Sequence, residues 1–476
     1  MQLLIFVLLY PVGLLAAPSS SQETVEQFLK EIVTESKTLK SSDLRRQQHL
    51  LKSEARQFIF DAEGFAGLDR VSQENPPSSP FAPSKVQKSV LKTGVSKLFP
   101  MGVRTSLNYE LTDETTEFTG RDNLEYYQPT ISLRAESNLF SDLFGERYAL
   151  IDPLMEQEKK QADLTYALEK KRLLGRALLD LAQVLEMQDE QVLTKKLCRQ
   201  TSRQTDYLEK RNKRGSINKR QLLISKKELN RCNSLTRQQK RDLLMRSTSM
   251  ETSYHIDPKP YLSLRVDDFF SSLKGLFKAA EQSSNFDIKA DLEYQTMKNR
   301  LTTLKTQYDI LLEESQPDVT LSVATGIMGA HSDIGEAHSE ALKANYPFVS
   351  LGVSTKIPWQ NRQLSSQLRQ NRLEAKAQEE DLAHMEQQKT KNFDVLKETI
   401  EADHKIYRSQ LKNVDLSRQI MDDAEKDFNI GRLDYNELAE FQKAYVDSRR
   451  QLGRLRLQIV IKTVEYLDHF GFFSSY

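Results

Sequence analysis

Glycine, proline and long hydrophobic runs are all scarce in this sequence. Among its 476 residues there are 17 glycines and 14 prolines, whereas charged residues make up 28% and the mean hydropathy is −0.59. Such a composition is typical of long solvated helices rather than of thick apolar cores. The chain is long enough for two or three ordinary domains, but its composition argues against them.

Beyond its first residues, the chain has no uninterrupted apolar run long enough for a transmembrane helix. Residues 1–17 are apolar and end in small residues, which predicts a secretory signal peptide even though the usual basic start is missing. No cysteine follows directly, so a lipoprotein anchor is not expected. A mature chain that enters a membrane must therefore use strands that close into a barrel.

A large net charge and catalytic motifs are also absent from the sequence. The formal net charge is +1, which implies no general affinity for nucleic acid. The seven histidines are scattered, and His331 with His338 lacks a third ligand at metal spacing. No phosphate-binding loop, nucleophile elbow or Cys-x-x-Cys pair occurs. We therefore expect neither an enzyme nor a cofactor.

Positive charge is nevertheless concentrated in one stretch. Between Lys195 and Asp242 there are sixteen lysines and arginines against four acids. Two interpretations remain open, a solvated helix surface or a docking surface for an acidic partner.

Two distant segments follow the same strand pattern. Residues 129–139 and 347–359 both begin with proline, reach Ser-Leu three positions later, and then alternate polar with less polar side chains. Strict alternation over about ten residues predicts a strand of the length that crosses a bilayer when tilted. We expect the polar face to line a water-filled lumen and the face with Val349, Leu351 and Val353 to contact lipid, although a one-residue slip would reverse them. The candidate lumen residues are Arg134, Glu136, Ser354 and Lys356.

The same arrangement occurs twice along the chain. In each half a strand hairpin leads into a long helix, which turns at a glycine and returns as a second helix. The strands superpose with an offset of 218 residues (347 minus 129), and the turn glycines, Gly215 and Gly431, with an offset of 216 (431 minus 215). Such duplication is hard to obtain by chance. The predicted segments are a signal peptide at 1–17, a first repeat at 18–247 with a strand hairpin at about 102–139, an irregular connector at 248–267, a second repeat at 268–470 with a strand hairpin at about 318–358, and a tail at 471–476.

The longest helical stretch repeats its apolar residues every seven positions. A strict seven-residue repeat imposes left-handed supercoiling against neighbouring helices. An ordinary coiled coil remains the local alternative, but such a protein has no use for hairpins of membrane-crossing length. The repeating residues are Phe393, Ile400, Tyr407, Val414, Met421 and Phe428.

Two hairpins give four main strands per chain, and four strands cannot close a barrel. An open edge in lipid is not viable, so several copies must contribute. Three copies would give twelve strands and twelve helical columns, although the strand count alone does not determine the number three.

This order of elements resembles the TolC family of outer-membrane efflux proteins. The matching motifs are the strand Pro-x-Val-Ser-Leu-Gly-Val-Ser…Ile-Pro-Trp at 347–359 and the glycine turn at 427–438, which has a counterpart at 213–223. The resemblance covers essentially all of the mature chain. It implies a mixed fold, in which a homotrimer forms a 12-stranded outer-membrane β-barrel continued by an α-helical barrel through the periplasm.

The resemblance also implies partners and a location. The chain would span the bacterial outer membrane, contact its lipid and extend into the periplasm. It would work with a periplasmic adaptor protein and an inner-membrane transporter in drug efflux or type I secretion. The alternative is a periplasmic coiled-coil interaction protein whose strands form a soluble β-domain.

In that family the glycine turns lie at the periplasmic tip, and acids after the second glycine ring the channel entrance. Here Glu437 and Glu440 hold those places, three apart and on one helix face. Three copies would place six carboxylates around the aperture and favour cations. The alternative is that these acids simply form the solvent-exposed face of an amphipathic helix. The family usually has Asp there, and the first half has Gln221 and Ile224 at the matching positions.

Two further residues beside Gly431 are candidates for the entrance. Phe428 and Arg432 are expected to make tip contacts that hold the closed state.

The only two cysteines lie at equal distances from the first glycine turn. Cys198 is seventeen residues before Gly215 and Cys232 is seventeen after it. Equal distances bring two positions level in an antiparallel helix hairpin, which predicts a disulfide in an oxidising periplasm. Closing that loop would stabilise the chain by about 3 to 4 kcal/mol. Two free or merely adjacent thiols are the alternative.

Overall fold

The computed structural model describes residues 20–74, 76, 82–118, 122–140, 145–283, 287–356 and 361–476. The predicted signal peptide and the Ile-Pro-Trp end of the strand motif lie outside these residues. The chain divides into two compact units. We call Gln47–Asp163 with Met297–Leu382 the strand unit, and Met1–Arg46, Leu164–Thr296 and Ala383–Tyr476 the helical unit.

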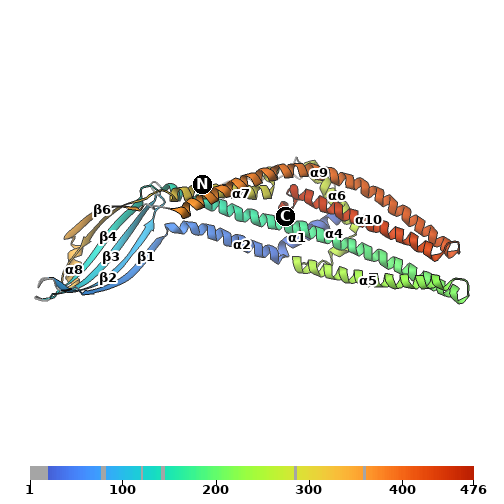
Figure 1. The fold of residues 1–476 in the computed structure, drawn as a ribbon, viewed down its shortest axis with the longest axis horizontal. Coiled ribbons are helices and arrows are strands. Elements are labelled where there is room, and N and C mark those ends of the chain that lie inside the picture. Colours follow the sequence, from blue (N-terminus) through green and yellow to red (C-terminus); the bar gives the residue numbers. More distant parts are fainter. Residues whose placement is uncertain are drawn as a thin grey trace. The chain divides into compact units, whose positions relative to one another are not determined.

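The strand unit contains one antiparallel sheet whose strands lie side by side in chain order (Figure 1). Each strand pairs with the next along the chain, so the sheet is a simple up-and-down meander. The strands are β1 (Ala62–Glu74), β2 (Pro83–Leu98), β3 (Val103–Phe118), β4 (Leu124–Asn138), β5 (Asp318–Met328) and β6 (Tyr346–Lys356).

The prediction of four strands per chain is wrong, because the described residues form six. An additional hairpin, β1 with β2, precedes the predicted one and pairs with β3 along almost all of β2. In β1 the apolar side chains do not keep to one face, since Phe65 and Val71 alternate with Leu68, so the strand lacks the pattern that reveals β4 and β6. Apolar residues at helical spacing predict a helix over about residues 22–65, but residues 62–65 belong to β1. Three copies would supply eighteen strands, not twelve.

The sequence predicts a polar loop over residues 329–345, but this connection between β5 and β6 contains a short helix. This helix, α8, spans Ile334–Leu342, and its first turn is capped by the Asp333 side chain, which accepts hydrogen bonds from Gly335 N and Glu336 N.

Long helices account for most of the remaining chain. Four of them, α2, α4, α7 and α9, continue from one unit into the other. The helices are α1 (Ser20–Glu35), α2 (Lys37–Glu54), α3 (Glu146–Ala149), α4 (Ile151–Lys213), α5 (Lys219–Tyr254), α6 (Val266–Ser283), α7 (Leu292–Glu314), α9 (Arg362–Asn429) and α10 (Tyr435–His469), with short 3₁₀ turns η1 (Ala55–Phe60), η3 (Tyr261–Ser263), η4 (Ile288–Ala290) and η5 (Phe472–Ser475). Helix α5 continues to Tyr254, well into the segment expected to be irregular.

The core of the helical unit forms where α1, α4, α6 and α10 bring apolar stripes together. In α1, residues at helical spacing such as Phe28, Leu29 and Ile32 are fully buried. On α9 the seven-residue repeat also faces inward, since Ile400, Val414, Met421 and Phe428 are buried. Among the described residues, no helix is both long and apolar enough to cross a membrane.

Candidate functional site

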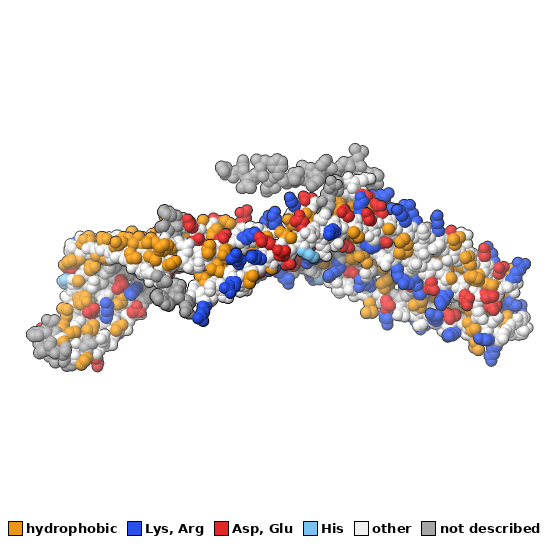
Figure 2. All heavy atoms as spheres, turned by 45° about the horizontal axis from the view of Figure 1, so that its top comes forward, with side chains coloured by type: hydrophobic (Ala, Val, Ile, Leu, Met, Phe, Trp, Pro, Cys, Tyr) orange, Lys and Arg blue, Asp and Glu red, His pale blue; other side chains and the backbone are white. Residues whose placement is uncertain are grey.

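The sheet has two chemically different faces. Alternate side chains of a strand point to opposite faces, and residues paired across strands share a face. The register therefore assigns nine large, exposed hydrophobic side chains to a single face (Figure 2). We call it the apolar face, and its members are Leu68, Leu91, Val95, Leu107, Leu133, Val323, Val349, Leu351 and Val353. Val349 is 77% exposed and Leu351 is 73% exposed, so the described residues leave the edge at β6 uncovered.

The opposite face, the polar face, carries charge. All four residues predicted from the two strand motifs share it, since Arg134 and Glu136 pair through β5 with the polar positions of β6, where Ser354 and Lys356 lie. Arg134 and Glu136 form an ion pair at 3.2 Å. The polar face also has Lys92 near Glu110, with Nζ and Oε2 3.9 Å apart, so its charges partly neutralise one another.

A polar cavity of about 330 Å³ lies within the strand unit where the sheet meets its helices. It is lined by Glu136 and Asp318 of the polar face and by Arg104 of β3. Arg147 and Glu314, which also line it, are joined by an ion pair of 2.7 Å. Sequence reasoning missed this cavity because its residues share no local pattern.

Both edges of the sheet are unpaired among the described strands. β1 pairs with β2 alone and β6 pairs with β5 alone. Each edge therefore presents a row of backbone N–H and C=O groups that another strand can pair with.

The two helix hairpins turn in the same way at equivalent glycines. Gly215 and Gly431 have φ of 71° and 82°, a left-handed conformation that strains any residue with a Cβ. In the first turn Ser216 N donates to Arg211 O at 3.0 Å, and in the second Arg432 N donates to Asp427 O at 2.9 Å. These pairs are displaced by 216 residues, so the duplication extends to individual hydrogen bonds.

Phe428 is buried inside the tip. It is 3% exposed and belongs to a cluster that includes Leu208 and Leu222 of the first hairpin and Leu438 of the second. Its ring meets Tyr207 edge-on, with centroids 5.8 Å apart. Phe428 therefore connects the two hairpins near their turns.

The other entrance candidates are exposed. Arg432 and Glu440 lie on the surface, as does Glu437. Glu437 also has a local role that the sequence analysis missed, because its carboxylate accepts from Asp434 N at 3.3 Å while the Asp434 side chain accepts from Glu437 N at 2.9 Å. This reciprocal arrangement is a capping box for α10, and its Asp-x-x-Glu spacing was readable in the sequence.

The two cysteines are joined in the structure. Cys198 on α4 and Cys232 on α5 form a disulfide, with Cα atoms 5.6 Å apart. The bond closes a loop around the Gly215 turn.

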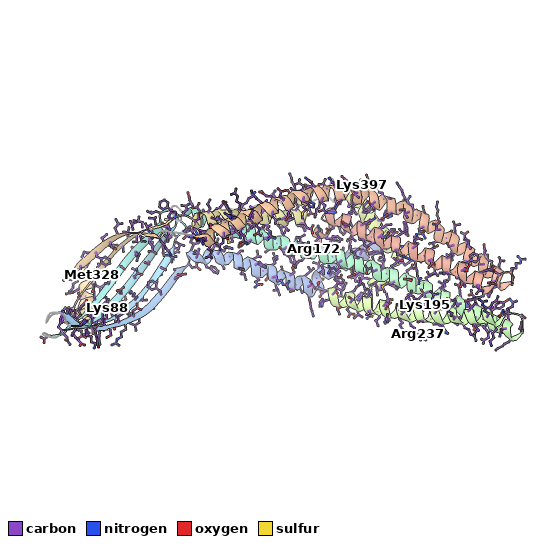
Figure 3. All side chains as sticks on the ribbon, in the orientation of Figure 1. Lys88, Arg172, Lys195, Arg237, Met328 and Lys397 are labelled. Carbon is purple, nitrogen blue, oxygen red and sulfur yellow. A yellow bond between two sulfur atoms is a disulfide. The ribbon has the colours of Figure 1, made fainter. Side chains whose placement is uncertain are left out.

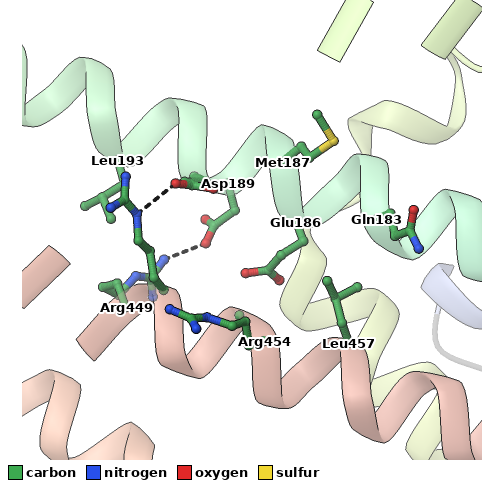
Figure 4. A pocket seen from close by; sticks show the side chains of 11 residues that line it. Gln183, Glu186, Met187, Asp189, Leu193, Arg449, Arg454 and Leu457 are labelled. Carbon is green, nitrogen blue, oxygen red and sulfur yellow. Dashed lines mark hydrogen bonds and ion pairs between the residues drawn. The ribbon is translucent and has the colours of Figure 1, made fainter. Parts of the chain in front are cut away.

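A charged pocket of about 230 Å³ separates α4 from α10 (Figure 4). Asp189 accepts from Arg449 at 2.6 Å, and Glu186 from the buried Arg456 at 3.3 Å. Burial raises the pKa of the Glu186 carboxyl, and the charge of Arg456 opposes that shift. A Cβ at Gly453 would lie 2.1 Å from Glu186 Oε1, so a larger residue there would require the Glu186 side chain to move. The pocket is a helix-to-helix contact whose acids are all engaged by arginines.

A second charged cluster joins α4, α7 and α9. Asp291, whose side chain is fully buried, lies 2.8 Å from Lys389 and 3.8 Å from Lys171. Burial alone would raise the pKa of neighbouring Glu293, but hydrogen bonds from Lys389 and Arg172 lower it to about 2. Because the folded pKa lies below the unfolded one, this group stabilises the fold above the unfolded pKa and loses that contribution as the pH falls towards about 2. Across the described ranges, no group of three or more potential metal ligands occurs.

Several solved outer-membrane channels have the same fold. The outer-membrane channel OprN matches with a TM-score of 0.68 and 12% identity, over 95% of this chain and 91% of that one. The outer membrane protein VceC of Vibrio cholerae matches with a TM-score of 0.66 and 10% identity, over 95% and 99%. The Campylobacter jejuni CmeC outer membrane channel matches with a TM-score of 0.66 and 10% identity, over 94% and 86%.

No protein-family model matches the chain, and neither does any curated protein. At identities of 10 to 12%, the structural likeness establishes the fold alone. The resemblance to TolC-type channels inferred from the sequence is confirmed at that level, as long helices with an antiparallel sheet.

Proposed function

We propose that the chain is a passive outer-membrane exit duct, working with a periplasmic adaptor and an inner-membrane transporter in efflux or type I secretion. The observation that carries the proposal is the apolar face of the sheet. Its side chains are large, exposed and continuous from β1 to β6. In water such a surface would cause association or aggregation, whereas in a bilayer it is the expected outer wall of a barrel.

The unpaired edges of the sheet support assembly from several copies. β6 of one copy and β1 of the next would pair and remove both edges, as lipid requires. If the assembly is the trimer expected of a TolC-type channel, its barrel has eighteen strands, a size that leaves an aqueous channel. Arg134, Glu136, Ser354 and Lys356 would then line the lumen.

Exposed apolar residues on the helices support the same assembly. On α9, Leu416 and Ile420 are 56% and 52% exposed on the side opposite the buried seven-residue repeat. On α5, Leu223 and Leu244 are 57% and 66% exposed. These surfaces would be covered where hairpins of neighbouring copies meet in a closed helical ring.

The turns at Gly215 and Gly431 would form the periplasmic entrance. Glu437 and Glu440 are exposed there and would face the aperture, while Phe428 and Arg432 would hold the closed state. Since the described residues include no metal cluster and the sequence no nucleotide-binding motif, energy would come from the inner-membrane partner.

Two matched arginine substitutions test the proposal. Leu351 and Ser350 are neighbours on opposite faces of β6. Leu351→Arg would place a charge against lipid at a cost of about 2 to 4 kcal/mol near the bilayer centre, whereas Ser350→Arg would face water. We expect Leu351→Arg to reduce sharply the amount of protein assembled in outer membranes and Ser350→Arg to assemble normally.

Membrane fractionation with a carbonate wash measures this difference. The alternative, a periplasmic protein with a soluble β-domain, requires that the unmodified protein elute as a monomer without detergent and that both variants behave alike. That result would contradict the channel.

A further inference from the structure

Helix α8 packs on the apolar face of the sheet. Its His338 stacks on Tyr109 of β3, with ring centroids 6.0 Å apart, and Tyr109 shares its face with Leu107 and Leu111. Gly329, at the end of β5, lies so close to the helix that a Cβ there would be 2.1 Å from Ala337 O. The helix is therefore held directly against the side of the sheet that carries the exposed hydrophobic residues.

The polar groups between helix and sheet satisfy one another. The Tyr109 hydroxyl and His338 Nε2 are hydrogen-bonded at 2.7 Å, and His338 Nδ1 lies 2.6 Å from Ile334 O. Both ring nitrogens and the hydroxyl therefore have partners without water. A contact built in this way can persist in an apolar medium, where an unpaired polar group is costly.

The outward side of α8 is amphipathic. Ala337 and Ala341 are buried against the sheet, whereas Leu342 is 71% exposed and Ile334 is 45% exposed. Three charged residues lie along another stripe of the helix. They are Glu336, Glu340 and Lys343.

We propose that α8 is an interfacial helix, which lies on the outside of the barrel and contacts lipid at the level of the headgroups. Its position in the β5–β6 connection puts it on the apolar face where β5 ends and β6 begins. There Leu342 would enter the acyl region while the charged stripe stays with headgroups and water. The inference rests on the proposed function, because it requires the apolar face to contact lipid.

Tryptophan quenching by brominated lipids tests the position of α8. Trp359 is the only tryptophan of the sequence, so Trp359→Phe gives a silent background. Into it we would introduce Leu342→Trp on α8, Leu351→Trp on the apolar face and Ser350→Trp on the polar face. Each full-length variant would be reconstituted in vesicles whose lipids are brominated either near the headgroup or deep in the chain.

We expect Leu342→Trp to lose about half of its fluorescence, with headgroup-proximal bromines more effective than deep ones. Leu351→Trp should be quenched in both sets of vesicles and Ser350→Trp in neither. Ile334→Trp provides a second reporter on the same helix if Leu342→Trp does not assemble.

Two results would overturn this inference, with different meanings. If the α8 reporters are unquenched while Leu351→Trp is quenched, α8 is covered by protein or water and the inference fails, although the channel stands. If Leu351→Trp is also unquenched, the apolar face does not contact lipid and the proposed function fails with it.

Discussion

The two halves of the chain have the same helix hairpin but differ in their strands and their charge. The first half contributes β1 to β4, whereas the second contributes β5, β6 and α8. Residues 195–242 contain sixteen basic and four acidic side chains, while the equivalent residues 411–458 contain nine of each. The duplicated part is therefore the helical scaffold, and the two copies have diverged in their strands and in the charge of their hairpins.

The basic excess of the first hairpin is a surface property. Pairs such as Lys226 with Glu209, at 3.3 Å, use the few acids available, and four acids cannot neutralise sixteen cations. Lys195 and Arg237 lie on the two helices of this hairpin (Figure 3). This arrangement fits both a docking surface for an acidic partner and a solvated face. The second hairpin, whose charge is balanced, is a matched control for any test of binding to an acidic partner.

Removing the additional hairpin should make the halves alike and produce the largest change. Ala62 and Lys97 are paired at the open end of β1 and β2, so deleting residues 62–98 joins chain ends that already lie side by side. Each copy would then supply four strands. Because barrel diameter grows roughly in proportion to strand number, the ring seen by electron microscopy should shrink by about a third. An unchanged ring would mean that β1 and β2 do not belong to the barrel wall.

The first hairpin has a disulfide that the second lacks, and substitutions can remove it from one and introduce it into the other. Cys198→Ser with Cys232→Ser should lower the free energy of unfolding by about 3 to 4 kcal/mol, as expected for a loop of this size. The positions seventeen residues either side of Gly431 are Val414 and Ser448, which provide a matched pair for Val414→Cys with Ser448→Cys. If the second hairpin opens during transport, the added bond should block export until a reductant is given. Export that continues with the bond formed would show that this hairpin does not need to open.

Neutralising the acids Glu437 and Glu440 near the Gly431 turn should have the smallest effect. Glu437→Gln keeps the capping box, because glutamine can accept the same hydrogen bond, so together with Glu440→Gln it tests charge without weakening α10. We expect a roughly twofold fall in the cation-to-anion permeability ratio in planar bilayers. The reciprocal variant, Gln221→Glu in the first hairpin, should raise that ratio. An identical reversal potential in all three proteins would exclude these residues from the aperture.

The sequence predicted features that depend on local pattern or on distance along the chain. The alternation around Leu351 identified β6 and its two faces, and the seven-residue repeat through Phe428 identified the buried side of α9. Equal spacing from Gly215 placed Cys198 level with Cys232. In each case a periodicity or a count determines geometry before any tertiary contact is known.

Features that depend on tertiary contacts were missed. β1 lacks alternation because only its pairing with β2 makes it a strand, and α8 is short enough to look like a polar loop until it packs on Tyr109. The buried cluster around Asp291 combines residues from distant helices, and no spacing in the sequence connects Lys171 with Lys389.

The even number of strands in the sheet has a consequence for assembly. Five successive antiparallel pairings make β1 and β6 run in opposite directions, so a neighbouring copy continues the up-and-down alternation without interruption. This holds for any number of copies, so strand direction does not determine how many chains assemble. In the proposed assembly the copy number would instead depend on the width and curvature of the helical ring, so we expect substitutions on the exposed surfaces of α5 and α9 to change how many chains assemble.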